Sequence, residues 1–296
     1  MEDTFLETLK MEKNHSANTI DAYAGDLRRF HNFLESNQSH TPANGQISPG
    51  SMMDFLEAEN RSGFSASTLQ RRKMVVVQFA QFLVNIGIFS REQVEEVLAW
   101  RPQLCQEIYQ QEILILSEDE IDRLMIENQP GGVVRSIRDQ SIISVLLETG
   151  LSISDVIGLR IGDLDLNHSR LTVTPSGQKS FVYPIPRSTE CLRRYITEER
   201  PEVAQSKDEE SLFISQLGGP ISRQGIWQML KNIGDRAEVQ VPLSPRVLRH
   251  TAVKRMINAG LSTREIQHRL GHTNVYSTRA LVRKIKRAIN KNRSAE

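Results

Sequence analysis

Apolar residues recur at three- and four-residue spacing along much of the chain, which predicts amphipathic helices. The first such segment carries Ile20, Tyr23, Leu27, Phe30 and Leu34. Ser16 precedes them and can cap the helix, because a serine side chain accepts a hydrogen bond from a free amide of the first turn. The segment 37–50 is rich in Asn, Ser, Pro and Gly and predicts a loop.

Further helices are expected before residue 100. One covers about 50–60, a long one starts at Ser65 or Ser67 and stops near Gly87, and a short one covers 90–98. Residues 101–116 have no clean period and predict a linker. With 296 residues the chain is long enough for two cores. The predicted division is an N-terminal helical domain at 1–103, a linker at 104–116 and a C-terminal domain at 117–296.

The C-terminal part predicts helices and one hairpin. Ser117 and Glu120 have the spacing of a capping box, and 135–148 is apolar enough to be a buried helix. Residues 169–185 alternate in polarity around Pro175–Gln178, which indicates two antiparallel strands. Other helices are expected at 188–198, 221–237, 245–259, 262–270 and 275–291. The expected fold class is mostly α with a small antiparallel sheet.

The net charge of the chain is +1, but the charged residues are distributed unevenly along the sequence. Residues 1–100 hold 9 Lys/Arg and 13 Asp/Glu, whereas 246–296 hold 13 Lys/Arg and 2 Asp/Glu. A concentrated basic segment on a near-neutral protein favours a polyanionic partner. A solvated basic tail is an equally good explanation of the charge alone.

Several function classes are disfavoured by what the sequence does not contain. The sequence contains no run of about 18 apolar residues, so no membrane span is expected. The acidic N-terminus differs from a secretory signal, which begins with basic residues. The two cysteines, Cys105 and Cys191, make neither a disulfide framework nor a zinc site. We therefore expect a cytoplasmic protein without metal, cofactor or membrane partner.

Four segments, in order, resemble the tyrosine recombinases of the phage-integrase and Xer group. TGLSISDVIGLRIGDLDL at 149–166 is similar to the first conserved box of that family, and LFISQLGGPISRQGIWQML at 212–230 to the segment before the second. LSPRVLRHTAVKRMINAG at 243–260 and IQHRLGHTNVYSTRAL at 266–281 are similar to the second box. Residues 16–34 and 65–88 resemble helices of the family's DNA core-binding domain.

The resemblance implies a SAM-like core-binding domain followed by a catalytic-type domain, which together close around duplex DNA as a C-shaped clamp. In this family a tyrosine oxygen attacks a DNA phosphate and forms a 3′-phosphotyrosyl link. Two arginines, a hairpin lysine and two histidine-type donors stabilise the negative charge that develops.

Most of these family positions hold other residues in this chain. The motif arginine Arg249 and the later histidine His272 are retained. Ser152 replaces the first arginine and Ser176 replaces the hairpin lysine. Arg246 replaces the first histidine and Leu281 replaces the tyrosine. Removing one such cation or donor lowers the rate roughly 10²–10⁵-fold. A leucine in place of the tyrosine removes the covalent route.

Three nearby residues are alternatives to the lost groups. Arg160 and Lys179 match residues that are commonly non-catalytic in the family. Tyr276, four residues after His272, replaces the nucleophile only if this segment folds differently. Leu281 shares a helical face with Ile285 and other apolar residues, which predicts a packing role.

DNA binding needs cations along the phosphates and does not need the catalytic set. The expected contact residues are Arg71, Arg72, Lys73, Lys179, Arg246, Arg249, His250 and Lys254. Taken singly, each arginine is explained equally well by a surface ion pair. The segment 279–296 either docks onto a neighbouring subunit, as the family's C-terminal helix does, or follows DNA as a basic tail.

The first functional hypothesis is a catalytically inactive homologue that binds double-stranded DNA and acts as an accessory or regulatory factor in recombination or integration. Its expected partners are DNA and either further copies of itself or an active recombinase. The second is an active recombinase with a rearranged site, and the third is a scaffold that binds only protein.

Overall fold

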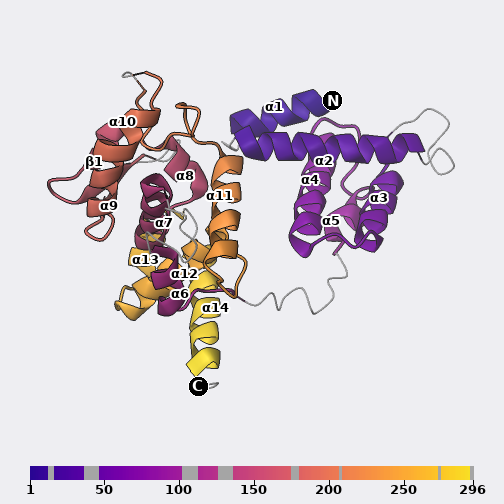
Figure 1. Cartoon of the computed structure of the whole chain (residues 1–296). Helices are drawn as coiled ribbons and strands as arrows, with labels where there is room; N and C mark the ends of the chain where they lie inside the picture. Colours follow the sequence, from indigo (N-terminus) through magenta and orange to yellow (C-terminus); the bar gives the residue numbers. More distant parts are fainter. Residues whose placement is uncertain are drawn as a thin grey trace. The chain divides into compact units, whose positions relative to one another are not determined.

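The computed structural model describes residues 1–12, 17–36, 47–101, 113–125, 136–174, 180–206, 209–272 and 275–293. The chain divides into two compact units, Met1–Gln111 and Glu112–Glu296 (Figure 1). The division falls within the segment 104–116 that the sequence predicts as a linker. None of the helices in the described residues combines the length and the apolar character that a membrane crossing requires.

The first unit is helical. Its described helices are α1 (Glu2–Glu12), α2 (Ala17–Ser36), α3 (Pro49–Arg61), α4 (Ala66–Asn85) and α5 (Glu95–Ala99). Ser65 is the N-cap of α4, because its side chain accepts a hydrogen bond from the amide of Thr68. Gly87 has a positive φ of 76° just beyond the end of α4, as the predicted stop requires. Helix α1 is not among the predicted elements, and α5 is shorter than expected.

Phenylalanine side chains form the centre of the first unit. Phe5 of α1 lies 5.2 Å from Phe79 of α4, and Phe30 of α2 lies 5.2 Å from Phe55 of α3, measured between ring centroids. All four are almost completely buried. Helix α1 therefore belongs to the core of this unit.

A buried ion-pair network joins α2, α3 and α4. The Arg72 side chain of α4 pairs with Glu59 of α3 and lies 3.5 Å from the Asp26 carboxylate of α2. Its guanidinium also lies 4.1 Å from the centre of the Phe64 ring. Arg72, Asp26 and Glu59 are all buried. Arg71 pairs with the same Asp26 at 2.5 Å and is partly exposed.

The second unit is mostly helical with one small sheet. Its described helical elements are α6 (Glu118–Met125), α7 (Ile137–Thr149), α8 (Ile153–Gly158), the 3₁₀ turn η2 (Ile161–Asp163), α9 (Thr189–Arg194), the π-helical turn η3 (Tyr195–Glu199), α10 (Arg200–Val203), α11 (Arg223–Arg236), α12 (Pro245–Asn258), α13 (Thr263–Arg269) and α14 (Val275–Arg293). Its strands are β1 (Leu164–Asp165), β2 (Arg170–Val173) and β3 (Phe181–Pro184).

The strands form an antiparallel sheet in the order β1-β2-β3. Arg170 is opposite Pro184 and Val173 is opposite Phe181, so β2 and β3 form the predicted hairpin. The expected fold class is therefore confirmed. Strand β1 was not predicted. The single helix expected at 188–198 is instead a run of α9, η3 and α10.

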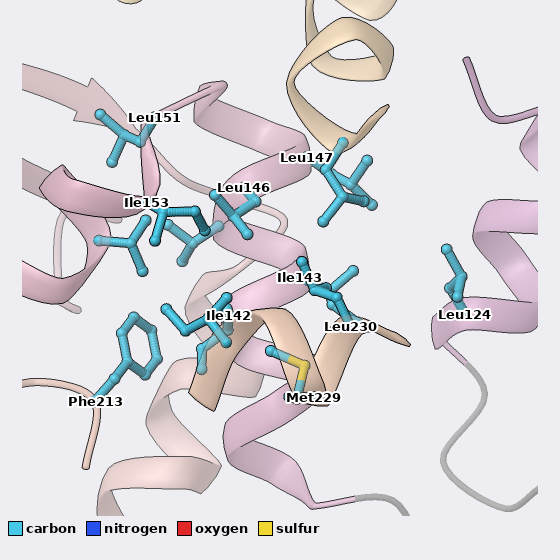
Figure 2. Packing of buried hydrophobic residues seen from close by; sticks show 14 of the residues in the cluster. Leu124, Ile142, Ile143, Leu146, Leu147, Leu151, Ile153, Phe213, Met229 and Leu230 are labelled. Atoms are coloured by element: carbon cyan, nitrogen blue, oxygen red, sulfur yellow. The ribbon is translucent and has the colours of Figure 1, made fainter. Parts of the chain in front are cut away.

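Helix α7 lies at the centre of the second unit. Ile142, Ile143, Leu146 and Leu147 are buried, and Figure 2 shows them beside Leu230 of α11. A helix that is apolar on nearly every side must be surrounded by other elements, which explains this position. The helix ends at Gly150 with φ 69°. A Cβ atom there would lie 3.1 Å from the Leu270 side chain, so glycine allows the close approach.

We predict that Arg72→Ala lowers the free energy of unfolding of the first unit by about 3 kcal/mol. The substitution leaves the carboxylates of Asp26 and Glu59 buried without their shared cation, and breaking a buried pair typically costs about 3–5 kcal/mol. The lower value is expected because Arg71 and Arg29 still contact these carboxylates.

The measurement is urea unfolding of the full chain in a Trp227→Phe background. The remaining tryptophan, Trp100, packs against the core of the first unit and reports on it. The control is the exposed Arg28→Ala, for which a change within about 0.5 kcal/mol is expected. Equal unfolding curves for the two variants would contradict the prediction.

Candidate functional site

Arg249 of α12 connects three segments of the second unit. Its Nη1 atom donates to the Gly150 carbonyl at the end of α7, 2.9 Å away. Its Nη2 atom donates to the Leu270 carbonyl after α13 at 2.9 Å and lies 3.0 Å from Nε2 of His272. The two retained family residues are therefore in direct contact. The sequence alone places them 23 residues apart.

The contacts of His272 define its protonation state. An arginine can only donate, so His272 Nε2 accepts from Arg249 and the ring proton lies on Nδ1. Nδ1 then donates to the Thr278 hydroxyl, 2.8 Å away on α14, and Thr278 is fully buried. Burial and the neighbouring Arg249 charge lower the pKa of His272. The imidazole is thus neutral and oriented from both sides.

Asp155 and Tyr183 belong to the surroundings of Arg249, and the sequence analysis did not assign either to the site. Burial lowers the pKa of Arg249, while the charge of Asp155 acts in the opposite direction. Burial, followed by the charge of Asp155, raises the pKa of Tyr183 to about 12. Its hydroxyl donates to the Arg269 carbonyl at 2.8 Å. In the sequence, only the alternation of apolar and polar residues along 181–185 indicated that the Tyr183 side chain points into the core.

Ser152 caps helix α8. Its hydroxyl donates to the Asp155 carboxylate at 2.6 Å, and the Asp155 amide donates back to the hydroxyl at 3.2 Å. The Ser152 amide also donates to the Asp155 carboxylate at 3.1 Å, which completes a capping box. The serine is engaged locally and supplies no positive charge. Arg160, the alternative cation in this box, forms an exposed ion pair with Glu210 at 2.8 Å.

Helix α14 carries both the family's tyrosine position and the alternative tyrosine. Leu281 is partly buried and packs against a cluster that includes Val282 and Ile285. Tyr276, in the first turn of the same helix, is 73% exposed and lies beneath the Arg279 guanidinium, 5.9 Å from ring centre to cation. The leucine therefore faces the packed side of the helix and the tyrosine faces solvent.

The other cations of α12 differ in their surroundings. Arg246 in the first turn is exposed. His250 is buried, and burial together with the charge of Arg246 lowers its pKa. Lys254 donates to the Leu116 carbonyl at 3.1 Å, and Arg255 pairs with Glu118 at 2.5 Å. Arg246 is thus the residue of this group that is placed to meet a phosphate without rearrangement.

The candidates of the first unit are also unequal. Arg71 is partly exposed, whereas Arg72 is buried in the ion-pair network with Asp26 and Glu59. Lys73 is half-buried, and burial and the Arg101 charge lower its pKa. Arg72 therefore lies where a phosphate cannot reach it in this conformation.

The family's hairpin position, Ser176, and the neighbouring Lys179 lie outside the described residues. Within the described part of the chain, no group of three His, Cys, Asp or Glu side chains is placed to hold a metal ion.

Family models match both units. Residues 115–286 match the model described as "Phage integrase family", and residues 3–87 match "Phage integrase, N-terminal SAM-like domain". The chain belongs to the phage integrase family of tyrosine recombinases, a family involved in DNA recombination. The resemblance inferred from the conserved boxes is thereby confirmed.

Similar proteins include two curated recombinases. Tyrosine recombinase XerD of Listeria monocytogenes serotype 4b is 26% identical over 278 residues, which cover 93% of this chain and 91% of the relative. Tyrosine recombinase XerC of Roseiflexus castenholzii is 29% identical over 279 residues, which cover 93% of this chain and 86% of the relative.

Solved structures share the fold. The Tn1549 transposon integrase in complex with transposon right end DNA superposes with a TM-score of 0.72 at 19% identity, covering 95% of this chain and 93% of that one. XerH site-specific recombinase bound to difH substrate gives a TM-score of 0.67 at 16% identity, covering 95% and 81%.

We predict that the second unit loses stability below about pH 6.5, in part through His272. The pKa of this histidine is lower in the folded chain than its ordinary value of 6.5. Its stabilising contribution is therefore complete above pH 6.5 and is lost as the pH falls through the lowered folded value. His272→Gln should show a shallower fall in unfolding free energy on acidification.

The measurement is urea unfolding followed by circular dichroism between pH 8 and pH 5. His268→Gln, at an exposed position in the same unit, is the control and should follow the wild-type curve. A His272→Gln curve parallel to the wild type would show that this histidine does not titrate differently on folding.

Proposed function

We propose that this chain is a catalytically inactive member of its family that binds duplex DNA and acts as an accessory or regulatory factor in recombination or integration. The observation that carries the proposal is the position of residue 281. The family's nucleophile is replaced there by a leucine whose side chain packs against the cluster formed with α12 and α13.

The surroundings of the retained residues support the loss of chemistry. Transesterification at a phosphate needs several cations or donors around the oxygens. Ser152 is a helix cap without charge, and Arg249 already donates to two carbonyls and to His272. The neutral His272 presents a proton to Thr278, not to a substrate.

DNA binding requires accessible cations, of which Arg246 is exposed and Arg71 and Lys73 are partly exposed. The proposed phosphate contacts are Arg246 of α12 and Arg71 and Lys73 of α4. Arg249, which is partly buried, adds positive charge to this region without a direct contact. Lys179 stays in the proposal on its sequence position alone. Partners in addition to DNA are proposed to be further copies of the chain or an active recombinase.

A second candidate function is an active recombinase that uses Tyr276. The observation that favours it is the exposure of this side chain close in sequence to His272. The missing cations argue against this candidate function. Whichever tyrosine attacks, the family cations that stabilise the charge on the phosphate are absent.

We predict no covalent adduct when the wild-type chain is incubated with a nicked suicide duplex and analysed on a denaturing gel. Leu281→Tyr alone should also give none, since Ser152 and Ser176 leave two cations missing. An active relative on its own substrate serves as the positive control. A wild-type adduct that disappears in Tyr276→Phe would establish the second candidate function and end the first.

We predict that the wild-type chain binds duplex DNA with an affinity that falls steeply with salt. Each phosphate contact contributes about −0.9 to the slope of log affinity against log salt concentration. Arg246→Ala should make the slope shallower by about one unit. Arg160→Ala removes the same charge from an exposed pair with Glu210 and is the matched control. Absence of any duplex binding at low salt would favour a scaffold that binds only protein.

A further inference from the structure

Helix α14 has two faces of very different character. Thr278, Val282 and Ile285 are buried on one side, where the helix packs against α12 and α13. The remaining sides carry six Lys/Arg and no Asp/Glu between Val275 and Lys291. Figure 1 shows this helix as the last element before the C-terminus. The apolar face is already covered, so an external partner meets the cationic face.

Four of these cations form a ladder along the helix. Arg279, Arg283, Arg287 and Lys291 follow one another at four-residue intervals, and all are exposed. Like charges at this spacing face each other and destabilise a helix by about 0.2–0.5 kcal/mol per pair. The helix itself offers no carboxylate to offset this repulsion. A polyanion would relieve it.

The ladder differs from three other arginines of this unit that lie at or near its surface. Arg160, Arg193 and Arg194 each pair with a glutamate: Glu210, Glu190 and Glu198, respectively. Arg283 and Arg287 form no ion pair with any residue that the structure describes. Their charge is therefore available to a partner, whereas that of the paired arginines is largely compensated.

The ladder also adjoins the candidate site. After burial and Arg246, the charges of Arg249 and Lys284 contribute to lowering the pKa of His250. Lys284 belongs to α14, so this helix and the start of α12 contribute to one positive region. The ladder from Arg279 to Lys291 spans about 18 Å of the helix axis on either side of Lys284, at about 1.5 Å per residue.

We infer that the ladder of α14 (Arg279, Arg283, Arg287 and Lys291) is a second phosphate-binding surface for duplex DNA, additional to the region around Arg246 and Arg249. This inference rests on the proposed DNA binding and extends it. Contacts of arginine and lysine with phosphates carry no sequence information. The ladder therefore adds affinity and salt dependence without adding specificity. A bilayer is a poor alternative partner, because the apolar face that would enter it is buried.

The test compares two triple variants with the same change in net charge. The ladder variant is Arg279→Gln, Arg283→Gln and Arg287→Gln, and the control is Arg160→Gln, Arg193→Gln and Arg194→Gln. Glutamine has a helix propensity close to that of arginine, so α14 is expected to persist, which circular dichroism verifies. Affinity is measured against salt for two duplexes of unrelated sequence.

The ladder variant should have a log–log slope shallower by about 2.7, from three contacts at about 0.9 each, on both duplexes. The control should keep a slope close to that of the wild type. Equal slopes for the two triple variants, with wild-type binding intact, would overturn the inference and leave the proposed function standing. A ladder variant that keeps its slope but loses self-association in sedimentation would show that the helix covers a second copy. Absence of wild-type binding would overturn both.

Discussion

The guanidinium of Arg249 holds together the part of the second unit on which the candidate site depends. It bridges the carbonyl that ends α7 and the carbonyl that ends α13, and it fixes the ring of His272. Both carbonyls stand at helix ends, where backbone groups have no partner within the helix. A single charged side chain thus satisfies two such groups and orients a histidine that in turn contacts α14. The geometry of the site follows from this one residue.

Ser152 and Leu281, which the proposed function treats as lost catalytic positions, both make structural contacts. Ser152 caps α8 through Asp155, and Leu281 joins an apolar cluster with Val282 and Ile285. Serine is among the best N-caps, and replacing such a residue by alanine costs roughly 0.5–2 kcal/mol. Restoring an arginine and a tyrosine would therefore disturb local contacts in addition to adding chemistry.

Periodicity in the sequence predicted most of the helices and the hairpin. Local patterns were sufficient there because caps such as Ser65 and the Ser117–Glu120 box act within four residues. The short helix α8 was missed because its six residues lie inside a conserved box and show less than two turns of period. Helix α1 was not predicted because its 11 residues form only about three turns, and its buried Phe5 and Leu9 are matched by partners on other helices.

Site residues were harder to predict because their environment depends on distant partners. Arg71, Arg72 and Lys73 are consecutive, and consecutive residues on a helix point in directions about 100° apart. Sequence alone cannot decide which of the three turns inward, because the carboxylates that bury Arg72 come from Asp26 and Glu59 on two other helices. The contact between Arg249 and His272 is likewise non-local.

The two inward-facing arginines explain why the charge available to a partner differs from the charge counted in the sequence. Arg72 and Arg249 are both matched to protein acceptors, so moving either toward a phosphate would leave buried groups unpaired, which costs about 1–3 kcal/mol or more for each. A phosphate that bound Arg72 or Arg249 would only replace hydrogen bonds and ion pairs that these side chains already form with the protein, so the net binding free energy would be small. Arg246, Arg283 and Arg287, which are exposed and form no ion pair with the residues that the structure describes, have no such cost. The proposed DNA binding is therefore expected to depend on the exposed surfaces of α12 and α14 more than on Arg249 and His272.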